Sequence, residues 1–443
     1  MITAHGVGGQ ADLPIPLSLA VGGAVAALLV SFAVLAAAWR SPRYQPSNAP
    51  TGRALPRLSK LVLSRGFRTA LRLVGMCGFV LAAAAALFGK EQLTNPFFGM
   101  VYVWWWVGVP LASVLLGPVW KVVSPVRAIH AGLAAATGAS ADEGLFRYPA
   151  WLGVWPAALG LFAFVWLELV YDNSSQLGDV RLWCAVYLGV MLVGGAVFGS
   201  RFYEMADPFE VFSTYSARLS PWRVDQEGTS QASVVLCSPL RNLSGAPALP
   251  GLTGVVAVLF GSTAFDSFSK STWWLQTIYD SSWPAWILEN LALIVFCAGT
   301  GALLAAGSML TRPSVDVRRP ALPNLFAHSI IPIIVAYFVA HYLTLLVDYG
   351  WQTLSQVSDP FGQGWNLFGT AGLTPSFWFA YHPTLLASIK VVAVVLGHVV
   401  AAVAAHDRAL AVLPAQHRVV GQLPLLIAMV GFTAGGLLLL FSA

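Results

Sequence analysis

The chain of 443 residues is 57% hydrophobic and only 10% charged, with a formal net charge of +5 at pH 7. A soluble globular domain has about 25% charged residues, so this composition excludes an ordinary soluble protein and predicts a chain surrounded mostly by lipid. The basic residues are spread along the chain and do not form one patch, which argues against nucleic acid as a partner.

Apolar runs long enough to cross the hydrocarbon core of a bilayer recur along the whole chain. We predict ten transmembrane helices, near residues 15–38, 69–89, 97–119, 150–171, 182–199, 251–268, 283–307, 323–347, 385–405 and 421–441. The expected fold class is an all-α polytopic helix bundle that forms one integral membrane domain over residues 1–443. Because no Lys or Arg precedes Arg40, we expect the first span to be retained and not removed as a signal peptide.

The positions of Lys and Arg predict the orientation in the membrane. Twenty of the 24 basic residues fall in the alternate connections 39–72, 120–149, 200–250, 308–322 and 405–420. Connections rich in Lys and Arg face the cytoplasm, so both termini are expected outside. Arg outnumbers Lys 19 to 5 in a chain rich in Ala, Val and Gly. This is typical of a GC-rich bacterial genome, so we expect the plasma (inner) membrane of a bacterium.

Two connections are long. Residues 200–250 are predicted as a cytoplasmic loop that carries an acidic run, and residues 348–384, rich in Gly, Trp, Phe and Pro, as an outer loop that lies on or dips into the membrane like a lid. The amino-terminal HGVGGQADLPIP either caps the outer surface or is a flexible leader. These outer segments contribute the candidate lid residues His5, Asp12, Asp359 and His382.

Short stretches of the chain resemble one another. LLGPVWKVVSPV (115–126) resembles VFGSRFYEMADPF (197–209), and VWLELVYDNSS (165–175) resembles WWLQTIYDSSW (273–283). These matches predict that the third to sixth spans are tandem helical hairpins, with the seventh and eighth spans a diverged copy. Repeats of this kind are common in transporters, where the binding site lies at the repeat interface.

Ionisable residues inside apolar spans are the main candidates for a functional site. In the run HSIIPIIVAYFVAHYLTLLVDYG (328–350), His341 and Asp348 are seven residues apart and so lie on nearly the same helix face, about 10 Å apart along the axis. At the same outer depth lie Glu168, Asp172, Asp266, Glu289 and Lys390. A charged side chain in a span is costly unless it pairs or faces water, so this group predicts an outward-facing polar site. The alternative is that Lys390 forms one structural ion pair and the remaining acids reach the headgroups.

His398, about 12 Å inward of Lys390, and His328 extend the candidate site toward the cytoplasm as a proton path, or are packed histidines with hydrogen bonds of their own. Cys77, Cys184, Cys237 and Cys297 show no disulfide or zinc-binding spacing and are interpreted as packing residues. The sequence contains no Walker loop, HEXXH or GxSxG motif.

At HGVGGQADLPIP, AAAWRSPRY, VYVWWWVGVPLASVLLGPVWKVVSPVR, GSTAFDSFS and FAHSIIPIIVAYFVAHY, and over nearly its whole length, the chain resembles a bacterial family of polytopic membrane proteins labelled fenitrothion hydrolase. The resemblance implies cleavage of an aryl phosphotriester, but it brings no catalytic motif that can be matched residue by residue. Hydrolysis of this kind usually uses a divalent metal ion. His341 and Asp348, with Glu289 and Asp266, have ligand types that suit such a metal, and Lys390 is the corresponding candidate electrophile.

Three functions remain open from the sequence. Transport or handling of a small solute or metal ion is the favoured interpretation, followed by a membrane-embedded hydrolase of organophosphate-type esters and by a membrane scaffold or assembly factor. The expected partners are the lipid bilayer and a small solute, a metal ion or a hydrophobic ester. No protein partner is predicted.

Overall fold

The computed structural model describes residues 12–44, 52–225, 232–311, 313–314 and 317–441. In this part of the chain, nine helical segments are long and apolar enough to cross a membrane. They are α1 (Leu17–Ala38), α3 (Arg65–Phe88), α4–η3–α5 (Pro96–Leu116), α9 (Leu177–Phe198), α13 (Leu252–Ser269), α15 (Ala285–Met309), η5 to α18 (Arg319–Val357), α19 (Pro383–Val412) and η9–α20 (Val420–Leu440). The predicted all-α polytopic bundle is confirmed, and the protein is a multi-pass membrane protein.

The remaining predicted span, the fourth, near 150–171, corresponds to α8 (Trp155–Leu169). It is apolar but only 15 residues long. At 1.5 Å per residue it covers about 22 Å, which is less than the hydrocarbon core of roughly 30 Å. Its buried face packs against α13 and α11 (Pro208–Ser216), so protein and not lipid surrounds much of it.

Two composite spans contain π-helical turns. The third predicted span, near 97–119, consists of α4 (Pro96–Phe98), π-helical η3 (Gly99–Gly108) and α5 (Val109–Leu116). The eighth predicted span, near 323–347, consists of η5 (Arg319–Ala321), α16 (Leu322–Ala327), η6 (His328–Ile330), α17 (Ile331–Thr344), π-helical η7 (Leu345–Tyr349) and α18 (Gly350–Val357). Segments η3 and η7 contact each other. Wide helical turns of this type are frequent at functional sites.

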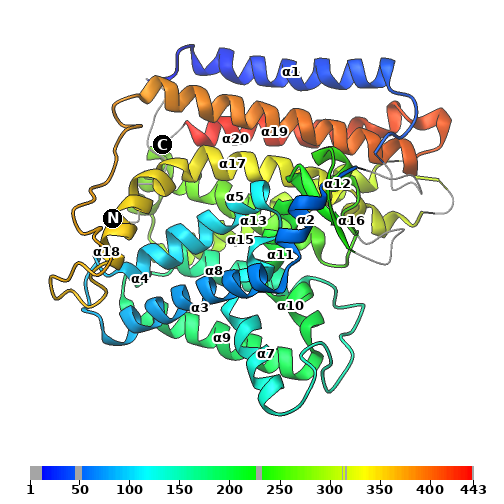
Figure 1. Cartoon of the computed structure of the whole chain (residues 1–443). Coiled ribbons are helices and arrows are strands. Elements are labelled where there is room, and N and C mark those ends of the chain that lie inside the picture. Colours follow the sequence, from blue (N-terminus) through cyan, green and yellow to red (C-terminus); the bar gives the residue numbers. More distant parts are fainter. Residues whose placement is uncertain (1–11, 45–51, 226–231, 312, 315–316, 442–443) are drawn as a thin grey trace.

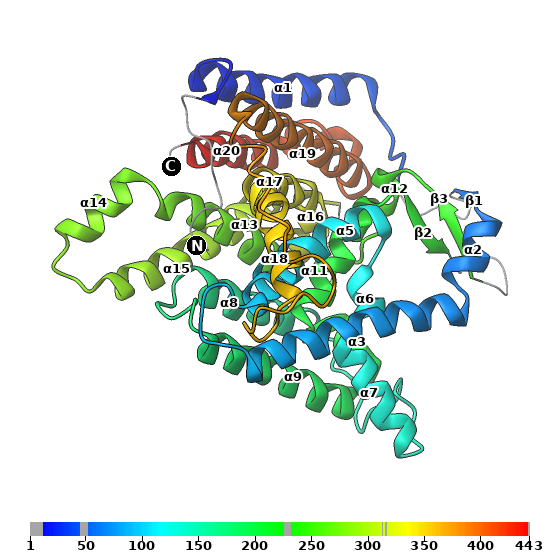
Figure 2. The same cartoon turned by 60° about the vertical axis from the view of Figure 1, so that its left-hand side comes forward.

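The first residue of α1 and the last of α20 lie at the same end of the bundle as α18, as the predicted orientation requires (Figure 1). We call this the outer end. The opposite, inner end carries α2 (Pro56–Val62), α12 (Pro239–Ser244) and a small antiparallel sheet of β1 (Arg53–Ala54), β3 (Ser233–Leu236) and β2 (Trp222–Asp225), in that order (Figure 2). A helix outside the spans, α14 (Thr272–Asp280), projects from the bundle in Figure 2.

Burial separates central from peripheral helices. In α13 and in the composite span around α17, 72% of the most apolar window is buried, against 11% in α3 and 22% in α1 and α9. The helices with little burial present apolar side chains outward, as lipid contact requires. Polar groups on α13 and α17 therefore lie in the interior of the protein, where an ionised side chain must find a partner or a ligand.

The segment 200–250, predicted as a loop, contains α10 (Ser200–Ala206), α11, η4 (Ala217–Leu219), strands β2 and β3, and α12. Every residue of α11 except Thr214 is buried, and α11 packs against α5, α8 and α6 (Val119–Val123). Of the acidic run Glu204, Asp207 and Glu210, the last two therefore lie in the protein core, while Glu204 stays partly exposed.

The two stretches that resemble each other in sequence also fold alike. Helix α5 ends at Gly117 with φ +83° and α9 ends at Gly199 with φ +67°, a backbone conformation that favours glycine. Each glycine is followed by a short helix, α6 or α10. Each short helix is followed by a helix whose first residue is proline, Pro125 of α7 (Pro125–Ala136) or Pro208 of α11. This local match agrees with the predicted tandem repeat.

Candidate functional site

A buried histidine–aspartate pair joins the two central helices near the outer end. The Nε2 of His341 on α17 lies 2.6 Å from Oδ2 of Asp266 on α13, and each residue is 2% exposed. Asp266 stands three residues before the end of α13, and His341 three residues before the end of α17. Two separate parts of the sequence thus meet in one site, one helical turn before the ends of α13 and α17.

Three further side chains contact this pair. Lys270 Nζ lies 2.9 Å from Asp266 Oδ1, and the Tyr342 hydroxyl donates to Oδ2 at 3.3 Å. Ser267 Oγ lies 3.4 Å from His341 Nδ1. If His341 donates its Nε2 proton to Asp266, its Nδ1 is left to accept the Ser267 hydroxyl proton. We call these five residues the outer cluster: Asp266, Ser267, Lys270, His341 and Tyr342.

Glu168 adds a second buried carboxylate from α8. It is 7% exposed, its charge interacts with Asp266 and Lys270, and neither of its oxygens has a hydrogen-bond partner in the described structure. Such a group normally has a partner, a proton or a bound ligand. The sequence analysis included Glu168 in the site, and the structure places it beside the outer cluster.

Lys390 joins the same region from α19. It is 1% exposed, and its charge interacts with those of Asp12 and Lys270. Of the nine candidates for the binding site and proton path, the structure therefore gathers Asp266, His341, Glu168 and Lys390 near one another. Lys270, Ser267 and Tyr342 were not predicted, although the spacing of Asp266 and Lys270, one helical turn apart, was a usable signal.

The other outer acids lie apart from the outer cluster. Asp348 is in η7, 6% exposed, and its Oδ1 has no hydrogen-bond partner. No hydrogen bond or ion pair between described residues joins Asp348 to His341. Glu289 on α15 interacts electrostatically with Asp172, which follows α8. The structure thus pairs His341 with Asp266 on another helix, and not with Asp348, which follows it by seven residues on its own span.

The two inner histidines bond to their own helices. His328 Nδ1 contacts the Leu325 carbonyl at 2.9 Å, and His398 Nδ1 contacts the Val394 carbonyl at 2.8 Å. Their Nε2 atoms are buried without a partner in the described structure. No hydrogen bond between described residues connects either histidine to the outer cluster, so the structure contains no continuous side-chain proton path there.

The candidate lid residues have local roles in the outer loop. Asp359 accepts hydrogen bonds from the backbone N–H groups of Gln363 (2.8 Å) and Gly364 (2.7 Å). Burial alone would raise the pKa of Asp359, but the backbone hydrogen bonds and the nearby Lys90 together lower it. His382 Nδ1 contacts the Trp378 carbonyl at 2.8 Å, and its ring stacks on that indole. Asp12 is half-buried near Lys390, and His5 lies outside the described residues.

Aromatic side chains close the protein directly inward of the outer cluster. Trp106, 1% exposed, packs against Phe164, Phe338 and Phe212 at ring-centroid distances of 4.8, 5.3 and 5.7 Å. Phe338 is three residues inward of His341, and Phe164 is four residues inward of Glu168. We call these four residues the aromatic plug. A polar solute at the outer cluster cannot pass inward unless this plug moves.

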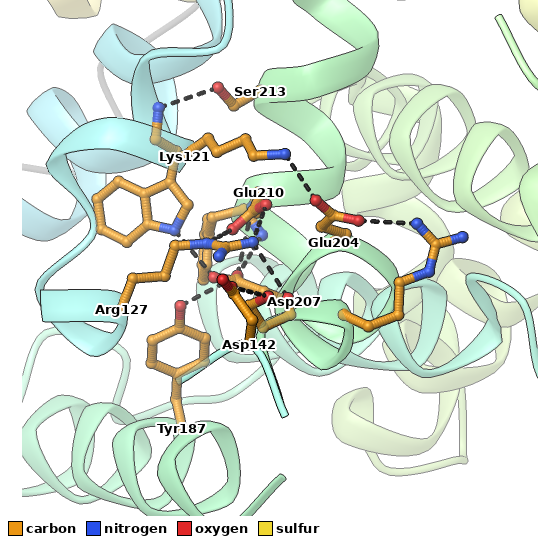
Figure 3. A network of polar contacts seen from close by, with 12 residues as sticks. Lys121, Arg127, Asp142, Tyr187, Glu204, Asp207, Glu210 and Ser213 are labelled. Carbon is orange, nitrogen blue, oxygen red and sulfur yellow. Dashed lines mark hydrogen bonds and ion pairs between the residues drawn. The ribbon is translucent and has the colours of Figure 1, made fainter. Parts of the chain in front are cut away.

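A second polar network lies inward of the plug, around α11 (Figure 3). Arg127 of α7 donates two bonds of 2.6 Å to the carboxylate of Glu210. Asp207, fully buried at the start of α11, accepts from Trp120 Nε1 and the Tyr187 hydroxyl, both at 3.0 Å, and from the backbone N–H of Phe209. We call these groups the inner network. It links α6, α7, α9 and α11.

The electrostatics of the inner network are set by burial. Burial, and after it the charge of Glu210, raises the pKa of Asp207 to about 7, although the hydrogen bonds from Trp120, Tyr187 and the backbone act in the opposite direction. The charge of Glu210 raises the pKa of Arg127 against its own desolvation. The network thus contains one fixed ion pair and one carboxyl group that titrates near neutral pH. The sequence pointed to the acidic run but assigned no role to it.

No group of three or more His, Cys, Asp or Glu side chains in the described part of the chain could hold a metal ion. Within the described residues, the predicted ligand pair of His341 and Asp348 therefore belongs to no group of this size. The four cysteines are free. Comparison with known proteins gives no family model, curated protein or solved structure that matches this chain.

Proposed function

We propose that the outer cluster is the binding site of a transport protein that takes up or exchanges a small polar solute in the plasma membrane of a bacterium, with protonation of the Asp266–His341 pair coupled to solute binding. The observation that carries this proposal is the position of that pair. It lies between the two most buried spans, contacts Lys270, and adjoins the unpartnered carboxylate of Glu168. Buried ionisable groups of this kind line solute and proton pathways in membrane proteins.

The mechanism follows from the pairing. With His341 protonated, the pair is an internal salt bridge that holds α13 against α17, and Lys270 holds the other oxygen of Asp266. A solute that bonds to Asp266, Lys270 or Glu168 competes with these contacts, so binding weakens the link between the two helices and changes proton affinity at His341. Inward release requires the aromatic plug to separate. Phe338 of the aromatic plug lies one helical turn inward of His341 on α17, so loosening of the α13–α17 link acts directly beside the plug.

The test is solute-dependent proton movement in proteoliposomes with an internal pH-sensitive dye. Small carboxylic acids, amines and divalent cations serve as probes. We expect a signal for at least one class with the wild type, and its loss in Asp266→Asn. His398→Gln is the matched control, because it removes a buried histidine that has no bond to the outer cluster. Absence of a signal for every class, or an undiminished signal in Asp266→Asn, contradicts the proposal.

A second function, hydrolysis of organophosphate-type esters, is favoured by one specific observation. Ser267, His341 and Asp266 have the order of contacts found in serine hydrolases, with a hydroxyl 3.4 Å from one ring nitrogen and a carboxylate 2.6 Å from the other. In this reaction Ser267 Oγ bonds to phosphorus, its proton passes to His341 Nδ1, and the aryl oxygen leaves with the bonding electrons and takes up that proton. A water molecule then displaces the serine oxygen from phosphorus, which regenerates Ser267 and completes the hydrolysis. The resemblance to the family labelled fenitrothion hydrolase agrees with such a substrate, and no metal is needed for this step.

A fluorophosphonate probe tests the second function directly. If Ser267 is the nucleophile, the probe labels the peptide that contains it, and labelling is lost in Ser267→Ala and in His341→Ala. Ser269→Ala is the control, because Ser269 lies on the same helix and donates to the backbone carbonyl of Asp266 without contacting His341 in the described contacts. Labelling that persists in Ser267→Ala excludes this serine as the nucleophile.

A further inference from the structure

An apolar cavity of about 550 Å³ lies between α3, η3 and α9, away from the outer cluster. This volume is within the range of roughly 300–1,000 Å³ typical of small-molecule sites. Its walls include Gly78 and Ala82 of α3, Trp104 and Trp105 of η3, and Cys184 of α9. Of the described residues that line it, Arg181 alone carries a charge. A cavity with these walls suits an apolar ligand.

The cavity is long and follows the membrane normal. Along α3 it runs from Gly75 to Leu87, which is about 18 Å at 1.5 Å per residue. One leaflet contributes about half of the roughly 30 Å hydrocarbon core, so the cavity is about as long as the acyl chain of one phospholipid. The small side chains of Gly78 and Ala82 leave space on the α3 side, while Gly75 packs closely against the backbone of Val123.

The helices that flank the cavity face lipid. On α3, Val74 and Val80 are 65% and 57% exposed, and on α9 Leu182 and Val186 are 63% and 57% exposed. Only a small part of α3 is buried, so a chain from the bilayer reaches the cavity by passing between α3 and α9. An opening in the hydrocarbon region is filled by lipid and not by water, because its lining offers almost no hydrogen bonds.

The charged end of the cavity indicates which lipid it suits. Arg181 is exposed near the start of α9, at the outer end, and its Nη1 donates to the Ala86 carbonyl at 3.0 Å. A guanidinium group has five N–H donors, so several remain for a phosphate oxygen. Arg181 lies at the outer end of the apolar cavity, so this site suits a lipid with a negatively charged headgroup whose acyl chain enters the cavity.

The inner end of the cavity touches the inner network. Trp120 and Tyr187 line the cavity with their rings, while their polar atoms donate to Asp207. Trp105 stacks on Trp120 at 5.2 Å and packs against Tyr187 at 5.3 Å. An acyl chain that reaches this end therefore packs against the two side chains that hold Asp207.

We propose that this cavity binds one acyl chain of an anionic phospholipid from the outer leaflet, with the headgroup phosphate on Arg181 and the chain end against Trp105, Trp120 and Tyr187. This lipid site is separate from the outer cluster and does not depend on the function proposed for that cluster.

The first test measures phospholipid retained by the protein purified in mild detergent. Ala82→Trp fills the cavity from α3, and Val80→Trp places the same side chain on the lipid-facing side of the same helix. We expect wild type and Val80→Trp to retain equal amounts of phospholipid and Ala82→Trp to retain several-fold less. Equal retention in the two tryptophan variants overturns the proposal. So does the recovery of an apolar molecule other than phospholipid that is lost only in Ala82→Trp.

The second test uses the wild-type chain and a phosphatidylglycerol with a photoactivatable acyl chain. Met100 and Trp104 line the cavity from η3, behind α3 and α9, so adducts on these residues mark a chain inside it. We expect such adducts in the wild type. We also expect Arg181→Gln to lower the adduct yield several-fold for phosphatidylglycerol, and to lower it less for the same probe built on phosphatidylethanolamine. Adducts confined to the exposed faces of α3 and α9 show only surrounding lipid and overturn the proposal. Equal adduct yields for the two lipids in the wild type overturn the role of Arg181.

Discussion

Arg127 and Glu210 occupy equivalent positions in two similar turns and pair with each other. Each is the third residue of a helix that begins with proline. In both cases an earlier helix ends at a glycine with positive φ, and one short helix lies between that glycine and the proline. Their two bonds of 2.6 Å join the two similar stretches of sequence at the inner side of the protein. The ion pair thus connects the repeats at corresponding residues.

We expect Glu210→Gln to lower the free energy of unfolding by about 3 kcal/mol, because the half-buried Arg127 loses the charged partner that it has in the core. The exchange variant Arg127→Glu with Glu210→Arg should recover part of this loss, since it restores an ion pair between the same two helices. Thermal unfolding in detergent measures both. If the exchange variant is less stable than Glu210→Gln, the two positions are not interchangeable.

Asp207 should make stability depend on pH. Its pKa is raised in the folded protein from the ordinary 3.8 to about 7. Between these two pH values the folded state therefore holds a proton that the unfolded chain has already released. The stabilisation from this proton is complete below the ordinary pKa and is lost as the pH rises through 7. We expect the Tm to fall by several degrees between pH 5 and 8, given about 1.4 kcal/mol per pKa unit.

Asp207→Asn is the matched variant for this dependence. It keeps the oxygen that accepts from the backbone N–H groups of Phe209 and Glu210, and it has no titrating proton. The Tm of this variant should change much less between pH 5 and 8. An unchanged slope assigns the pH dependence to other groups.

Neutralising Glu168 and neutralising Asp266 should have different effects on the free energy of unfolding. Glu168→Gln is expected to change the free energy of unfolding by less than about 1 kcal/mol, because the carboxylate of Glu168 makes no hydrogen bond in the described structure. Asp266→Asn should cost about 3 kcal/mol, because His341 and Lys270 lose their charged partner. Chemical unfolding of the two variants side by side checks the order. Equal losses contradict it.

Two adjacent glycines of α20 should differ in their tolerance of a methyl group. A Cβ at Gly436 falls 1.6 Å from the Tyr337 hydroxyl oxygen, whereas a Cβ at Gly435 meets no atom within 4 Å. We expect Gly436→Ala to destabilise the protein by about 1–3 kcal/mol through overpacking, and Gly435→Ala to be neutral or slightly stabilising. Adding Tyr337→Phe to Gly436→Ala should restore part of the loss. Equal Tm values for the two alanine variants contradict this close contact.

The apolar runs alone identify the protein as a polytopic helix bundle and locate its helices. Each predicted span corresponds to an apolar helix, although two helices continue further than predicted, to Val357 and Val412. The helix of the eighth span contains His341 and continues past its predicted end at residue 347 to include Asp348. This succeeds because the bilayer imposes one local requirement on every span, an apolar run of sufficient length whose backbone groups bond within the helix. The repeat between residues 115–126 and 197–209 was also visible in the sequence, because glycine and proline fix the backbone locally.

Which ionisable groups meet depends on how the helices pack in three dimensions. Seven residues of separation placed His341 and Asp348 on one helix face, yet His341 bonds to Asp266, 75 residues away, because the packing of α13 against α17 turns those two side chains toward each other. The burial of Asp207 and Glu210 in a segment that reads as a loop, and the cavity between α3, η3 and α9, likewise follow from how the helices rotate and cross. These rotations depend on contacts between residues distant in sequence, and no local pattern of hydrophobicity records them.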